Sequence, residues 1–113
     1  MAMTKEIVWV GDSLKVVQGF PKKARKEIGS ELRTVQRGQD PENWKPMKSI
    51  GPGVREIRVN SDQNQFRTIY VTKFIEAVYV LHAFQKKSQK TSPKDLKLAV
   101  KRFRQLINDR ENE

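Results

Sequence analysis

The sequence predicts an α+β domain in which helices flank a mainly antiparallel sheet. Three observations support this prediction. An apolar, β-branched run at Glu6–Val10 reads as a strand, two helical segments follow it, and three further strand-like runs precede a last helix. The resulting order β-α-α-β-β-β-α is that of helices packed on a sheet. A chain of 113 residues supports one core, so we expect a single domain over residues 1–113.

The first two helices are predicted from apolar spacing and from signals at their ends. Gly11-Asp12-Ser13 breaks the first strand and offers caps for a short helix over Leu14–Gln18. Pro21 suits the first turn of a longer helix that runs to about Gln36. Apolar residues form one stripe along this longer helix: Ala24, Ile28, Leu32 and Val35.

The last helix begins at Ser92, which precedes Pro93 and has Asp95 in the first turn. Its apolar stripe consists of Leu96, Val100, Phe103 and Ile107. We expect this helix to cover Pro93–Ile107 and the tail, Asp109–Glu113, to fray.

Three strand-like runs occupy the middle of the chain, at Val54–Val59, Gln65–Thr72 and Ala77–Gln85. The connections between them, Asn60–Asn64 and Lys73–Glu76, are short enough for hairpins, so we expect an antiparallel meander. Residues 38–53 are rich in Gly and Pro and are predicted to form a loop.

Charge is the strongest functional signal in the composition. Lys and Arg number 23 against 13 Asp and Glu, which gives a net charge of +10. This balance favours a polyanionic partner, nucleic acid above all, over a merely soluble basic surface. The chain has no cysteine, which excludes disulfides and thiolate chemistry. No apolar run of membrane-spanning or signal-peptide length occurs, so we expect a cytoplasmic protein that is not bound to a membrane.

Conventional catalytic signatures are missing, and we predict neither a cofactor nor a metal site. What the chain offers instead is a set of cations on or after the predicted meander strands. These are Arg55, Arg58, Arg67, Lys86, Lys87 and Lys90. Such a set suits RNA cleavage, because a ribose 2′-hydroxyl can attack its own adjacent phosphate. The protein then has to orient the RNA, neutralise the developing charge and move protons.

Each of these residues also has a structural interpretation. Arg67 shares a strand face with Ile69 and Val71, so it is alternatively a structural arginine paired with Glu56. Arg55 and Arg58 have opposite parity, so either a bulge intervenes or some of these cations only tether phosphates. Lys86 and Lys87 are alternatively a solvated charge run. His82 suits acid–base work but is more often a structural histidine, and Tyr70 and Phe84 are more often core than base-stacking residues.

Several separated tracts, in order along nearly the whole chain, carry a family resemblance. The two strongest are Phe66–Val71 and Val80–Thr91. Upstream stand four shorter tracts: Phe20-Pro21, Gln36-Arg37-Gly38, Trp44–Met47 and Val54–Arg58. Together they resemble the RelE-superfamily toxins of type II toxin–antitoxin pairs, in the HigB-like, phage-derived branch.

The resemblance implies a RelE-like fold and a ribosome-dependent messenger-RNA endonuclease that inhibits translation. It implies that mRNA on the ribosome is the target and that a cognate antitoxin, often with a helix-turn-helix, is the partner. By the same analogy Arg58, Arg67 and Lys86 or Lys87 are catalytic, and we add His82 as a further candidate. We expect Arg55, Tyr70 and Lys90 to bind the nucleic acid. RelE also carries a functional tyrosine near its C-terminus, whereas this chain has no tyrosine after Tyr79.

Two other functions stay open at this point. One is a ParE-like inhibitor of DNA gyrase, from the same superfamily, which cuts nothing. The lysines at positions 86, 87 and 90 argue against it, because a gyrase inhibitor needs no cluster that clamps phosphates. The other is a nucleic-acid-binding module without catalysis.

Overall fold

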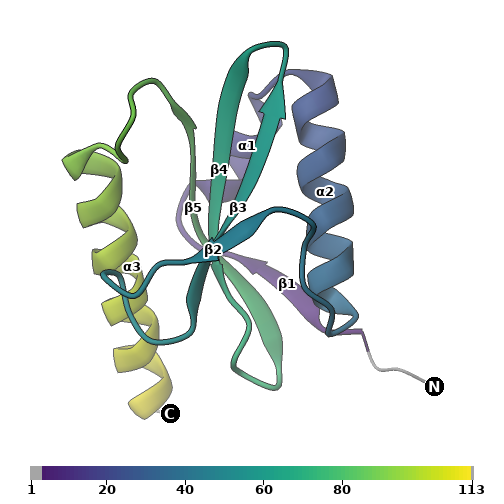
Figure 1. Ribbon diagram of the computed structural model, residues 1–113. Helices are drawn as coiled ribbons and strands as arrows, with labels where there is room; N and C mark the ends of the chain where they lie inside the picture. Colours follow the sequence, from purple (N-terminus) through teal and green to yellow (C-terminus); the bar gives the residue numbers. More distant parts are fainter. Residues whose placement is uncertain (1–3, 113) are drawn as a thin grey trace.

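A five-stranded mixed sheet with helices on both faces makes up the part of the chain that the structure, a computed structural model, describes: residues 4–112 (Figure 1). Its elements are β1 (Glu6–Trp9), α1 (Ser13–Gln18), α2 (Lys22–Gln36), β2 (Trp44–Pro46), β3 (Val54–Ser61), β4 (Asn64–Val71), β5 (Ala77–Lys86) and α3 (Pro93–Glu111). This arrangement confirms the predicted α+β class and is compatible with a RelE-like fold. No helix within these residues is long and apolar enough to cross a membrane.

The sheet has the strand order β1-β5-β4-β3-β2. Strands β3, β4 and β5 pair antiparallel in sequence order, which confirms the predicted meander. Strand β1 instead pairs parallel with β5, with Glu6 opposite Ala77 and Trp9 opposite Val80. The two helices between β1 and β2 cross one face of the sheet and so allow this parallel pairing (Figure 1).

Alternation along the strands sends apolar side chains to two separate cores. On one face, Ile57, Phe66 and Val80 pack against the stripe of α2 that the sequence predicts. On the other face, Ile69, Leu81 and their neighbours pack against Ala99 and Phe103 of α3. The α1 and α2 side is therefore one layer of the molecule and α3 is the other, with the sheet between them (Figure 1).

The prediction that residues 38–53 form only a loop is wrong at Trp44–Pro46, which forms the edge strand β2. Hydrogen bonds to β3 hold this segment, from Met47 N to Val54 O at 2.8 Å and from Arg58 N to Asn43 O at 2.9 Å. Three residues that end in a proline carry no periodic signal, and a proline is tolerated at a sheet edge because no further strand needs its missing N–H.

Two ends also differ from the prediction. Helix α3 continues to Glu111, so the residues from Asp109 to Glu111 do not fray; Glu113 lies outside the described residues. The β3–β4 turn is tighter than expected, because Ser61 pairs with Asn64 and only Asp62 and Gln63 connect them. Both have positive φ, 51° and 67°, as a two-residue hairpin turn of the primed kind requires.

Candidate nucleic-acid interface

The sheet register gathers three of the predicted cations on the face that α3 covers. Arg58 of β3 stands directly opposite Arg67 of β4. Arg67 in turn pairs with Phe84 of β5, and Gln65 pairs with Lys86. Paired residues project to the same face of a sheet, so Arg58, Arg67 and Lys86 share one face. The only break in the β4–β5 register falls between Ile69 and Tyr70, beyond these pairs.

Arg67 itself is buried, with 2% of its surface exposed. Its Nε lies 3.7 Å from Oε1 of Glu56, which is 1% exposed. Its Nη1 donates to the Phe66 carbonyl at 2.9 Å, and its Nη2 donates to Oε1 of Gln65 at 2.8 Å. Burial lowers the pKa of Arg67, and the charge of Glu56 opposes that shift. The pairing of Arg67 with Glu56, which is the structural interpretation of this arginine, is therefore confirmed.

A polar groove of about 790 Å³ is lined by residues of the β3–β4 hairpin and of the end of β5 with the segment that follows it. Its lining residues are Arg58, Gln63, Asn64, Gln65, Gln85, Lys86, Lys87, Ser88 and Gln89. Each of them is a cation, an amide or a hydroxyl, and the set contains no carboxylate. These are the groups that bind phosphate and base edges in RNA.

Lys86 occupies an electropositive position at this groove. Desolvation by burial lowers its pKa most, and the charge of Arg67 lowers it further, against the effect of Glu56. Smaller contributions in the same direction come from Lys45 and Arg58. Four cations from four adjacent strands thus act on one region, which is the electrostatic footprint expected of a surface that binds a polyanion.

A second, smaller pocket of about 210 Å³ adjoins the groove and is lined by the end of β5 and the start of α3. The two share Gln85, Lys86, Lys87 and Ser88, and the second pocket adds Phe84, Lys90, Ser92 and Asp95. Lys90 therefore lies near the predicted site but not in the groove that contains Arg58. The lysines at positions 87 and 90 are exposed, so both are open to solution.

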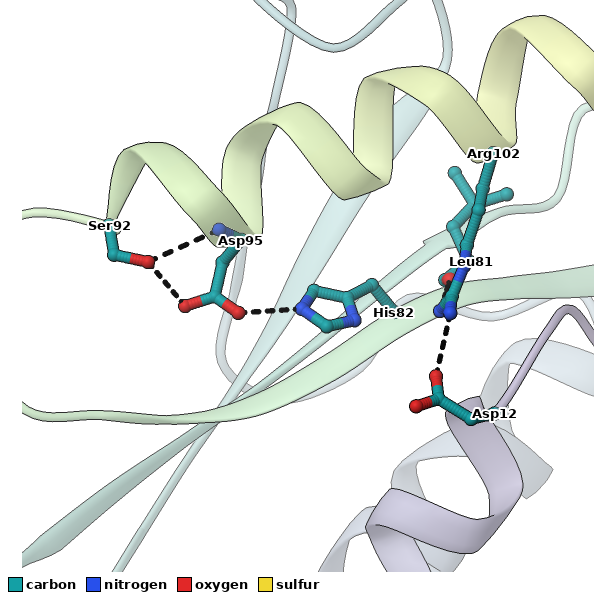
Figure 2. Close-up of polar contacts among 6 residues, drawn as sticks. All are labelled: Asp12, Leu81, His82, Ser92, Asp95 and Arg102. Carbon is teal, nitrogen blue, oxygen red and sulfur yellow. Dashed lines mark hydrogen bonds and ion pairs between the residues drawn. The ribbon is translucent and has the colours of Figure 1, made fainter.

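His82 is buried beside this second pocket and links β5 to the start of α3 (Figure 2). Its Nε2 lies 2.7 Å from Oδ1 of Asp95, whose other oxygen accepts from the Ser92 hydroxyl at 2.6 Å. The Ser92 hydroxyl also accepts from the Asp95 N–H, which confirms the predicted start of α3. The His82 ring stacks on Phe84 with 5.5 Å between centroids. His82 therefore joins β5 to the start of α3 and is not among the lining residues of the groove.

Arg55 and Tyr70, which are predicted to bind nucleic acid, lie on the opposite face of the sheet from Arg58 and do not line the groove. Tyr70 is fully buried in the core beneath α2, and burial raises its pKa to about 12. Arg55 stacks over Trp44 at 4.1 Å and forms an ion pair with Asp40 at 2.7 Å. Strict alternation along β3 causes this separation, because Arg55 and Arg58 are three residues apart.

Two residues of this region escaped the sequence analysis. Lys45 stands opposite Glu56 and so faces the same side as Arg58, but the strand that carries it was not predicted. Gln65 lines the groove and contacts Arg67, and no motif singled it out. Strand alternation could have identified Gln65, because residues 65 and 67 are two positions apart on one strand and therefore project to the same face.

The fold and the groove together define a small α+β protein with a cationic polar site at one end of its sheet. Residues 15–104 match the model of the family described as "Phage derived protein Gp49-like", so the chain belongs to that phage-derived, RelE/toxin-like family. The matched span includes every lining residue of the groove. No curated protein matches the chain at a significant level.

Proposed function

We propose that this protein is the toxin of a type II toxin–antitoxin pair, in the HigB-like branch, and that it cleaves messenger RNA on the ribosome. The observation that supports this best is the groove, in which Arg58 and Lys86 stand near each other on one sheet face among amide side chains and without a carboxylate. Membership of a toxin-like family supports the same conclusion. A gyrase inhibitor needs no such phosphate-binding surface.

The reaction is an attack of a ribose 2′-hydroxyl on its adjacent phosphate. The bond between O2′ and phosphorus forms, the bond between phosphorus and O5′ breaks, one proton leaves the 2′-hydroxyl and one reaches the departing oxygen. Arg58 offers a planar fork of donors for phosphate oxygens, and Lys86 offers a compact charge. Preorganised charges of this kind, aimed at the developing negative charge, are commonly the largest contribution to such catalysis.

Lys87 and Lys90 bind flanking phosphates in this proposal, because both are exposed and line the groove or the pocket next to it. The buried Arg67 contributes a fixed positive charge near the groove and positions the side chain of Gln65. His82 supports the start of α3 and takes no part in proton transfer. These roles revise the sequence-based assignment, which placed Arg67 and His82 among the residues that act on RNA.

Cleavage on translating ribosomes tests the proposal. Purified protein is added to stalled ribosome–mRNA complexes, cleavage sites are mapped by primer extension, and product ends are identified by mass spectrometry. We expect 5′-hydroxyl ends and 2′,3′-cyclic or 3′-phosphate ends. Arg58→Ala and the double variant Lys86→Ala/Lys87→Ala should each slow cleavage by at least about 10²-fold, the scale for losing a preorganised charge.

The matched control is the double variant Lys22→Ala/Lys23→Ala, which removes two exposed lysines from α2 on the other side of the sheet. It should cleave like the wild type. Intact mRNA with the wild type, or 3′-hydroxyl ends, would refute the proposal. Inhibition of DNA gyrase by a protein that leaves mRNA intact would instead establish the ParE-like alternative.

A cytoplasmic antitoxin with a helix-turn-helix completes the proposal, because a nuclease that acts on cellular messages must be restrained. Stable complexes of this kind bury about 1,600 Å² in total. Co-expression of the chain with the product of the neighbouring reading frame, followed by purification of one tagged protein, should recover both. Recovery of the tagged chain alone, with normal host growth when it is made without the neighbour, would contradict the pairing.

A further inference from the structure

Gln65 lines the groove, and its carboxamide is held by a buried side chain. It lies on β4 between Asn60 of β3 and Lys86 of β5. The residue is exposed and lines the groove, yet its Oε1 accepts a 2.8 Å hydrogen bond from Nη2 of the buried Arg67. An exposed glutamine is ordinarily free to rotate, so this anchor is an unusual constraint on a surface side chain.

The identity of the anchor sets which end of the amide faces the groove. A guanidinium only donates hydrogen bonds, so the Gln65 oxygen must point at Arg67. The amide nitrogen, Nε2, is then left on the other side, and within residues 4–112 it makes no hydrogen bond. The groove therefore contains a carboxamide N–H₂ group whose direction is determined by a buried arginine.

Arg67 is itself locked in place, which makes the arrangement rigid. Its Nη1 is held by the Phe66 carbonyl, and Glu56 lies 3.7 Å from its Nε. Both charged residues are almost completely buried. A donor held by such a support needs little reorganisation when a ligand arrives, and this is the property that makes a donor effective in stabilising developing charge.

We propose that Gln65 donates from Nε2 to a non-bridging oxygen of the scissile phosphate, between the charges of Arg58 and Lys86. Arg67 is then a positioning residue, which acts on the RNA through Gln65 and not by contact. This inference rests on the proposed ribonuclease function and adds to it a neutral donor that the charge pattern of the sequence does not reveal. It also explains how a fully buried arginine influences an exposed groove.

The variant Gln65→Glu removes the N–H donor of Gln65 but keeps the oxygen that accepts the hydrogen bond from Arg67. A carboxylate still accepts from Arg67, so the packing is retained, but it has no N–H to offer. We expect single-turnover cleavage to slow by at least about 10²-fold, the scale for losing one oriented donor. The midpoint of urea unfolding should stay equal to that of the wild type or rise, because the carboxylate makes a charge-assisted bond to Arg67.

The variant Asn60→Asp controls for the added negative charge, since Asn60 is exposed, stands directly opposite Gln65 on β3 and is not among the lining residues of the groove. It should slow cleavage by less than about tenfold, the scale of one partly screened surface charge. A phosphorothioate at the scissile phosphate gives an independent readout. Sulfur accepts hydrogen bonds poorly, so one diastereomer should be cleaved slowly by the wild type, and Gln65→Ala should reduce that discrimination.

The outcomes separate this inference from the function on which it rests. If the wild type cleaves mRNA while Gln65→Glu and Asn60→Asp lose activity equally, Gln65 only satisfies a hydrogen bond of Arg67 and the inference is wrong. An unchanged phosphorothioate discrimination in Gln65→Ala would overturn it as well. If the wild type leaves mRNA intact, the proposed function fails and this inference fails with it.

Discussion

Arg58 and Arg67 stand directly opposite each other on neighbouring strands, although both carry a positive charge. Like charges in a cross-strand pair are ordinarily destabilising. The pair persists because the buried carboxylate of Glu56 lies 3.7 Å from Arg67 and offsets its charge, while Arg58 is only partly buried and reaches the groove. Arg58 is thus available to a ligand, whereas Arg67 is buried next to the groove.

The first prediction concerns the buried ion pair. Arg67→Ala leaves the carboxylate of Glu56 buried without its partner, so the free energy of unfolding should fall by about 3–5 kcal/mol, the usual cost of breaking such a pair. The double variant Arg67→Met/Glu56→Leu replaces both charges by apolar groups and should be markedly more stable than Arg67→Ala. Urea unfolding followed by circular dichroism measures both. Equal stability of the single and double variants would show that the pair does not matter.

The second prediction is that RNA binding depends strongly on salt. This prediction rests on the net charge of +10 and on the cations that line the groove. If Z phosphates of single-stranded RNA are contacted, log K should fall with log salt at a slope of about −0.7Z. Fluorescence anisotropy at several salt concentrations gives the slope, which Lys86→Ala/Lys87→Ala should reduce in magnitude and Lys22→Ala/Lys23→Ala should not. A binding constant that is flat with salt would contradict the electrostatic interpretation.

The third prediction assigns His82 a structural role. His82→Ala removes the contact that joins β5 to Asp95 at the start of α3, so stability should fall by about 1–3 kcal/mol. Cleavage by the folded variant should stay within about tenfold of the wild type, because His82 does not line the groove. Single-turnover rates at a temperature where both proteins are folded make the comparison. A cleavage rate that falls by about 10²-fold or more in a fully folded variant would show that His82 is catalytic.

The fourth prediction is an alkaline transition at Tyr70. Burial raises the pKa of Tyr70 to about 12, whereas an exposed tyrosine in the unfolded chain ionises near pH 10. The folded state therefore keeps its proton where the unfolded state loses it, and the free energy of unfolding should fall as pH rises from about 10 to about 12. Absorbance at about 295 nm in a Tyr79→Phe variant reports Tyr70 alone. Full ionisation near pH 10 in the folded protein would show that the phenol is not buried.

Local sequence patterns were sufficient for the element order and for much of the core. The stripe of α2, the Ser92 start of α3 and the three meander strands each depend on residues close together in the chain, so periodicity and capping chemistry reveal them. The short strand β2 lacked such a signal, since its three residues are held by hydrogen bonds to β3 and not by a pattern of their own.

The charges and the family resemblance were likewise enough to predict that Arg58 and Lys86 lie together, and both line the groove. What the sequence by itself could not determine was which cations reach the surface. That depended on the β3–β4 register and on the packing of α3 over the sheet, which bury Arg67 together with Glu56. Burial and the pairing of distant residues arise only when strands and helices pack, so the orientation of Gln65 by Arg67 was decided by tertiary structure alone.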